Sequence, residues 1–121
     1  MADIVIGRKQ TFPITGALTL TPAQSGSVMV VSKAAAYTIT LPAPSLASMG
    51  CEYTFFGGAT VANEVKIDTG AANRAYGTIS QDGDNVEITG GRTVSFAGGS
   101  DRGDYIHCVC DGTVWYFVCQ S

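Results

Sequence analysis

The chain has 121 residues, which is enough for one domain with a hydrophobic core and too few for two. Hydrophobic residues make up 45% and charged residues 14% of the sequence, and the formal net charge is −3. Because only 7 residues are Lys or Arg and they form no long basic cluster, we expect no binding to nucleic acid or to an anionic membrane. No apolar run approaches the roughly 18 residues of a membrane span.

The first fifteen residues differ from the rest of the chain. Residues 1–10 read MADIVIGRKQ and lack the apolar core and cleavage site of a signal peptide, so we expect synthesis and folding in the cytoplasm. The tripeptide FPI at 12–14 has no clear hairpin partner. We therefore expect residues 1–15 to form an extended arm and residues 16–121 to form one β-sandwich domain. The arm either packs on its own domain or adds a strand to a neighbouring subunit.

The middle of the chain alternates apolar and polar residues with a period of two, which is typical of half-buried strands. Turn clusters rich in Gly, Asp and Asn separate these runs, while 21–26 and 45–50 read as single helical turns at corners. The spacing predicts an all-β fold, an antiparallel β-sandwich of jelly-roll type with about eight to ten strands. We expect its core to include Ile39, Leu41, Tyr53, Phe55, Ile67, Ile88, Phe96, Ile106, Trp115 and Phe117.

The C-terminal stretch at 105–119 reads YIHCVCDGTVWYFVC, two β-rich runs around an Asp-Gly pair, and this predicts a hairpin with a two-residue type I′ turn. In that register Cys110 faces Thr113 and Cys108 faces Trp115. One face then points into the core with Ile106, Cys108, Cys110, Trp115, Phe117 and Cys119. The other face is too apolar to be left in water, so we expect another surface to cover Tyr105, His107, Val109, Val114, Tyr116 and Val118.

The four cysteines are expected to be buried free thiols, because three lie in predicted strands and the chain shows no secretion signal. A zinc site is the alternative, but a CxC pair, one distant cysteine and a single histidine on the opposite face do not match the usual ligand spacings. We therefore expect no bound metal at these side chains.

The sequence offers few groups for catalysis. His107 and Cys108 are adjacent in a strand and point to opposite faces, so they do not form a nucleophile–base pair, and we expect His107 at a surface or interface. The aspartates lie in or beside turns, where Asp bonds its own backbone, although 82–85 offers a weak calcium-loop alternative. The tripeptide RGD at 102–104, which integrins recognise, is read as a turn entering a strand. We expect no enzyme activity and no cofactor.

Several segments together resemble small β domains of tailed-bacteriophage virion proteins. The resemblance is carried by ALTLTPAQSGSVMVVSKAAAYTITLPAPSLASMGCEYTFF, then VKID, then YIHCVCDGTVWYFV, and it covers residues 17–119. In that group a proline corner follows a segment like TITLP, a glycine leads into an aromatic strand, and DGTxW closes the domain. The group includes head decoration (cement) proteins, head fibres and pieces of tail fibres, and many of its members are trimers.

This resemblance implies a structural protein of the virion. One domain with an arm favours a decoration protein that binds the outer surface of the phage head as a homotrimer, with the major capsid protein as its partner. The alternative is a head-fibre or tail-fibre knob that binds a host receptor or glycan, for which Tyr76 and Tyr105 are candidate platforms. The residues that we expect at the oligomer or capsid interface are Ile4, Val5, Ile6, Phe12, Ile14, Val109, Val114, Tyr116 and Val118.

Overall fold

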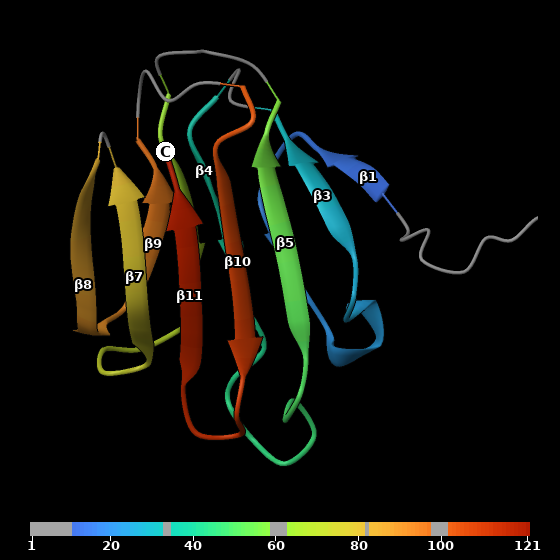
Figure 1. Cartoon of the computed structure of the whole chain (residues 1–121). Coiled ribbons are helices and arrows are strands. Elements are labelled where there is room, and N and C mark those ends of the chain that lie inside the picture. Colours follow the sequence, from blue (N-terminus) through green and yellow to red (C-terminus); the bar gives the residue numbers. More distant parts are fainter. Residues whose placement is uncertain (1–10, 33–34, 59–62, 82, 98–101) are drawn as a thin grey trace, which may run out of the picture.

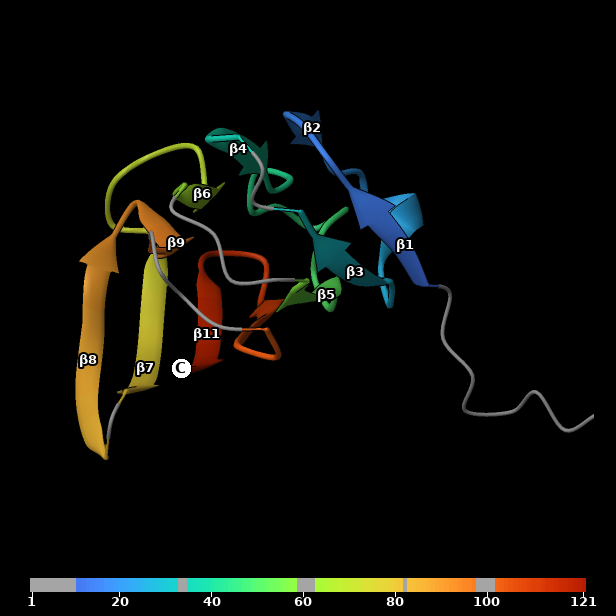
Figure 2. The ribbon, with the colours of Figure 1, turned by 90° about the horizontal axis from the view of Figure 1, so that it is seen from above.

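The period-two segments form strands in two facing sheets. The computed structural model describes residues 11–32, 35–58, 63–81, 83–97 and 102–121. Within these ranges the large sheet has the strand order β1-β3-β5-β10-β11-β7-β8 and the small sheet has the order β2-β4-β6-β9 (Figure 1). Figure 2 shows the small sheet lying over one face of the large one.

The strands are short, as expected for loop-rich β proteins. The large sheet contains β1 (Thr11–Ile14), β3 (Val28–Val31), β5 (Glu52–Gly57), β7 (Ala75–Gln81), β8 (Asp84–Gly91), β10 (Tyr105–Cys110) and β11 (Trp115–Gln120). The small sheet contains β2 (Leu18–Thr19), β4 (Tyr37–Thr40), β6 (Val65–Asp68) and β9 (Thr93–Phe96). One 3-10 turn, η1 (Pro22–Gln24), lies in the first predicted corner. The described part of the chain holds no helix with the length and apolar character needed to cross a membrane.

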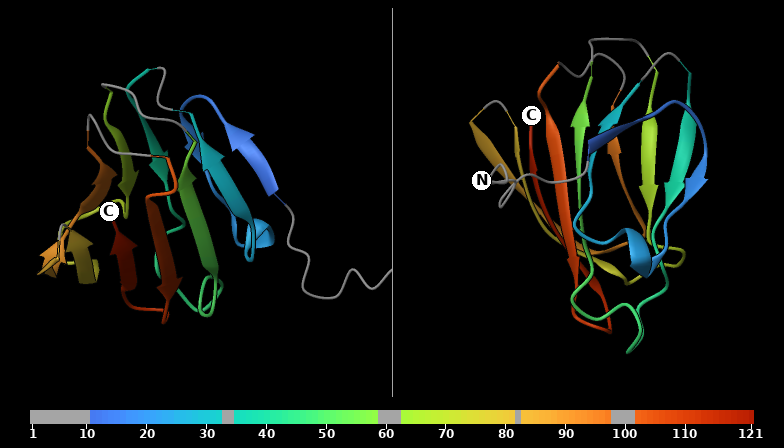
Figure 3. Two further views of the ribbon diagram at one scale, coloured as in Figure 1. Left: turned by 45° about the horizontal axis from the view of Figure 1, so that its top comes forward. Right: turned by 90° about the vertical axis from the view of Figure 1, so that its right-hand side faces the viewer.

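Both sheets are mixed, so the all-β prediction is confirmed but its antiparallel, jelly-roll form is not. The pairs β1–β3, β3–β5, β2–β4, β4–β6 and β7–β11 are parallel. Most of the parallel pairs arise from the path of the chain, since the first six strands alternate between the two sheets. Each return to the same sheet therefore runs in the same direction, as the two layers in Figure 3 show.

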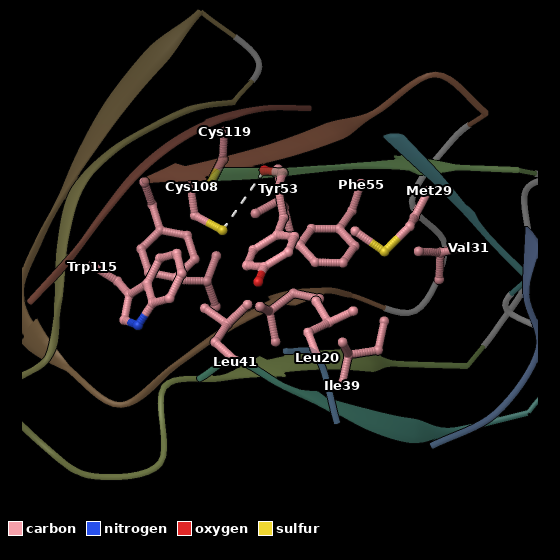
Figure 4. Close-up of a cluster of buried hydrophobic side chains, with 14 of the residues drawn as sticks. Leu20, Met29, Val31, Ile39, Leu41, Tyr53, Phe55, Cys108, Trp115 and Cys119 are labelled. Atoms are coloured by element: carbon pink, nitrogen blue, oxygen red, sulfur yellow. Dashed lines mark hydrogen bonds between the residues drawn. The ribbon is translucent and has the colours of Figure 1, made fainter. Parts of the chain in front are cut away.

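The core lies between the sheets and is centred on the aromatic residues of β5 and β11 (Figure 4). The rings of Tyr53 and Trp115 are 5.8 Å apart and tilted by 32°. Nine of the ten predicted core residues are buried, and the exception is Ile88 on the edge strand β8, which is half-buried because the narrower small sheet leaves this edge partly open. The buried polar atoms are also satisfied: within the described residues no buried side-chain N or O atom lacks a hydrogen bond.

The closing hairpin has the predicted faces but not the predicted register. Cys110 pairs with Trp115 and Cys108 with Phe117, so four residues connect β10 to β11. The side chain of Asp111 accepts hydrogen bonds from the backbone N–H groups of Thr113 and Val114, at 2.8 and 2.9 Å, and this Asx-type turn replaces the type I′ turn. Because the slip is two residues, each side chain keeps its face.

The last part of the expected arm, residues 11–14, belongs to the large sheet. Residues 11–14 form β1, which pairs in parallel with β3 at the edge of the large sheet. Ile14 is 4% exposed and packs in the core of its own domain, which corrects its assignment to an interface. Residues 1–10, with Ile4, Val5 and Ile6, lie outside the described residues, and so does the side chain of Phe12.

Gly77 gives a test of the packing of β7 against β11. Its φ is 141°, and a Cβ atom there would lie 1.9 Å from the carbonyl oxygen of Phe117. We expect Gly77→Ala to lower the free energy of unfolding by at least about 3 kcal/mol, because the clash involves backbone and φ lies in a glycine-only region. Chemical denaturation measures this change.

Gly50→Ala is the matched control, since Gly50 also has a positive φ of 83° but no atom within 4 Å of the added Cβ. We expect a loss of about 1–2 kcal/mol there, from backbone strain alone. Equal losses for the two variants would contradict the close approach of β7 and β11.

Candidate functional site: the outer face of the large sheet

The side of the large sheet that faces away from the core carries a concentration of apolar and aromatic residues. We call this surface the outer face and define it by β3, β5, β10, β11 and β7. Because these strands alternate in burial and their registers are known, the outward side chains fall into three rows across the sheet. The rows are Val30–Phe56–Tyr105–Gln120–Ser80, Val28–Thr54–His107–Val118–Thr78 and Glu52–Val109–Tyr116–Tyr76.

The outer face of the small sheet is different. Its outward side chains are Thr38, Lys66 and Ser95 in one row and Thr19, Thr40, Asp68 and Thr93 in the next. Every one of these seven is polar, whereas eight of the fourteen in the rows of the large sheet are apolar or aromatic. One sheet is therefore built to face water, and the other has a surface whose composition is typical of a contact.

Two pairs of side chains order the middle of the outer face. The rings of Phe56 and Tyr105 are 5.8 Å apart and tilted by 51°. Thr54 Oγ1 and His107 Nδ1 are hydrogen-bonded at 2.8 Å. The imidazole of His107 therefore lies on the outer face, whereas Cys108 and Cys110 of the same strand point into the core, so the ring does not contact their thiols.

At the lower end of the outer face, Tyr116 lies beside the hairpin turn. Its hydroxyl donates to the carboxylate of Asp111, and this contact raises the pKa of Tyr116. The pKa of Asp111 is lowered, first by the N–H groups of Val114 and Thr113 and then by Tyr116. On the neighbouring strand, Tyr76 is the register partner of Tyr116, so two tyrosines lie side by side next to a carboxylate.

The predicted interface residues divide into two groups. Tyr116 and Val118 are on the outer face and are 45% and 53% exposed, and Val109 is there but half-buried. Val114 is half-buried in the hairpin connection, where its N–H bonds Asp111, so it lies beside the face and not on it.

Sequence reasoning missed three members of the outer face, Val28, Val30 and Phe56. They lie in the runs VMVV and TFF, where both faces of the strand are apolar. Alternation disappears in such runs, so no period-two signal separates inward from outward residues. In the closing hairpin the Asp-Gly turn aligns the two strands, and this alignment shows which residues share a face even where both faces are apolar.

The buried thiols do not form a reactive centre. All four cysteines are free and buried, as predicted. Burial raises the pKa of Cys108 strongly and that of Cys119 to about 12, so both thiols stay protonated near neutral pH. No group of three or more His, Cys, Asp or Glu residues in the described ranges is arranged to hold a metal ion.

The hollows of the described surface are small or shallow, including an open depression of about 240 Å³ beside Glu64 and Lys66. A cleft of about 100 Å³ between β9 and the ends of β10 and β11 is far below the roughly 300 Å³ of ordinary ligand pockets. A shallower depression of about 370 Å³ is lined by residues 13–18 and Gln24, none of which is an acid or a base. Residues 102–104 form the expected turn, in which Gly103 N–H bonds the carbonyl of Gly57.

No family model matches this chain, and a search of the curated proteins found no match. The outer face therefore has to be interpreted from its own residues.

The burial of the thiols predicts their reactivity. At pH 8 we expect iodoacetamide to leave Cys108 and Cys119 of the folded protein unmodified, since the reactive thiolate is suppressed by burial, and to alkylate all four cysteines in denaturant. Mass spectrometry of the labelled protein measures this. Burial raises the pKa of both thiols in the folded state above the unfolded value of about 8.5. The folded state therefore holds these protons more tightly, and the free energy of unfolding should decrease as the pH rises above about 8.5. Rapid native labelling of Cys108 would contradict the packing of β10.

Proposed function

We propose that this protein is a non-enzymatic structural component of a tailed-bacteriophage virion, a decoration (cement) protein that binds the outer surface of the head as a homotrimer. The observation that carries the proposal is the contrast between the apolar outer face of the large sheet and the polar outer face of the small sheet. The resemblance to phage virion domains supplies the location, and the lack of a reactive centre among the described residues supports a mechanical role.

In this proposal the outer face packs against the outer faces of other copies. Val118 and Tyr116 are the most exposed apolar side chains of that face. Removing apolar surface from water stabilises the association by about 25 cal/mol per Å². Closed cyclic symmetry allows three copies to cover these faces around one axis. The polar face of the small sheet then points to water.

The trimer would clamp neighbouring major capsid subunits after the shell has expanded. Each added contact raises the free energy needed to rupture the shell under the pressure of packaged DNA. No covalent bond is made or broken, so no acid, base or nucleophile is required. Many copies bound to one lattice also gain avidity from their shared support. The protein is made in the host cytoplasm and functions on the capsid surface.

Val118→Lys tests this role, because it places a charge in the middle of the outer face. We expect the variant to stay folded, since Val118 is 53% exposed, but to weaken association by at least about 2 kcal/mol per contact, because a charge is left unpaired in the interface. Light scattering measures the oligomer, and heating of decorated virions measures rupture.

Ser95→Lys on the polar face of the small sheet is the control, and we expect it to change neither assay. Virions that carry Val118→Lys or lack the protein should rupture at a lower temperature. Equal rupture temperatures with and without the protein would contradict the cement role.

A head-fibre or tail-fibre knob that binds a glycan is the second candidate. The observation that favours it is the pair Tyr76 and Tyr116 beside the carboxylate of Asp111, because aromatic rings stack on the apolar faces of sugars and a carboxylate accepts hydroxyl hydrogen bonds. A glycan array distinguishes the two functions. Specific binding that is lost in Tyr116→Ala would favour the knob, and no binding is expected for the cement protein.

A further inference from the structure

The longest open edge of the large sheet is β8, which contains neither proline nor lysine and is interrupted only by a bulge at Gly90, near its C-terminal end. The other edges are short: β1 and β9 have four residues and β2 has two, and β1 also contains Pro13. β8 has eight residues and no proline. Natural proteins normally blunt such an edge with proline, charged side chains, a bulge or a covering segment, because it is ready to pair with another strand. In β8 the bulge lies at one end, and the charges repel only a partner that is also acidic.

The free backbone groups of β8 can be assigned from the neighbouring strands. The carbonyl of Ser80 accepts a hydrogen bond from Ser121 N–H, so the even-numbered residues of β7 bond toward β11 and the odd-numbered ones toward β8. In β8, the residues opposite the even-numbered positions are Asn85, Glu87 and Thr89. Their N–H and C=O groups therefore point to the open edge, beyond which no described strand lies.

Two side-chain features show which kind of strand this edge fits. Val86 is 50% exposed on the side of β8 that faces the core layer, since the small sheet does not reach beneath it. Asp84 and Glu87 are exposed and make the edge acidic. A suitable partner is therefore an extended segment that brings apolar residues on one side and positive charge.

We propose that residues 1–10 of a second copy of this chain add as a strand to the edge of β8. This segment has Ile4 and Ile6 two positions apart, which is the spacing that places both on the face that Val86 occupies, and its two cations, Arg8 and Lys9, outnumber its one acid, Asp3. Ten extended residues reach about 33 Å, enough to run along an eight-residue strand of about 27 Å.

The pairing has to be between copies. β1 and β8 lie at opposite edges of the large sheet, six strand spacings or about 29 Å apart (Figure 2). The residues before Thr11 would use nearly their whole length to reach their own β8 and have none left to pair with it. Head-to-tail contacts of this kind form a ring when the rotation between neighbouring copies closes after three, which is the symmetry that the proposed trimer requires.

The added strand also supplies missing contact area to the proposed trimer, on which this step rests. The outer face of β3, β5, β10, β11 and β7 measures about 24 Å by 20 Å, or about 480 Å², from strand spacing and rise. A standard stable interface buries about 800 Å² per partner. A paired strand on β8 adds contact area beyond the outer face.

Glu87→Pro in the full chain tests the backbone contact, with Glu87→Ala as its matched control. Both variants remove the carboxylate, but only proline removes the N–H that faces the open edge, and the β7–β8 ladder does not use that group. We expect Glu87→Pro to associate at least about fivefold more weakly than Glu87→Ala in sedimentation velocity over a concentration series. Equal association would overturn the proposal.

A charge exchange tests the partner and does not depend on proline being tolerated. We expect Glu87→Lys to weaken association severalfold and the further changes Arg8→Glu and Lys9→Glu in the same chain to restore it. Failure of this rescue would overturn the pairing of β8 with residues 1–10. Val118→Lys tests the outer-face contact of the proposed function separately. If Val118→Lys weakens association and the Glu87 variants do not, the strand pairing is wrong and the outer-face contact stands. If only the Glu87 variants weaken association, the strand pairing stands and the outer-face contact is wrong.

Discussion

The structure depends on the packing of Tyr53 and Trp115 at the centre of the core, with the polar atom of each ring bonded to a corner of the chain. The Tyr53 hydroxyl donates to the carbonyl of Thr21 at 2.5 Å, next to η1, and Trp115 Nε1 donates to the carbonyl of Pro42 at 3.1 Å, where the chain leaves β4. These two bonds attach the connections between the sheets to the middle of the large sheet. Without them, two large aromatic residues would bury unsatisfied polar groups.

This arrangement decides which surfaces are left for contact. The inward side chains of β5, β10 and β11 are all used in the core, so the residues between them point outward as one continuous face. Because these strands occupy the middle of a seven-stranded sheet and the small sheet covers only one side, that face has no cover among the described residues. The same difference in width leaves the edge at β8 open. The uncovered outer face and the open edge at β8 therefore both follow from packing a four-stranded sheet against one side of a seven-stranded sheet.

The sequence predicted the features that depend on neighbouring residues, such as strands and the faces of the hairpin. It predicted poorly the features that depend on how the chain passes between the two sheets. Alternation identified Tyr37–Thr40, Val65–Asp68 and the final hairpin, and parity within the hairpin placed Val118 and Tyr116 outward despite the register slip. Ile14 was misassigned because a lone apolar residue after a proline has the same appearance in an arm and in an edge strand. Val30 and Phe56 were missed because their neighbours are equally apolar.

The sequence by itself determined that this chain is all-β, that its thiols are buried and that its closing strands have one core face and one apolar outer face. These properties follow from residue type and spacing over a few positions. Only the tertiary structure decided that the strands run in mixed directions, that β1 belongs to the large sheet and that β8 forms its open edge. Strand direction and neighbours depend on how the chain crosses between two layers, and the free energy of that choice comes from contacts between residues far apart in sequence.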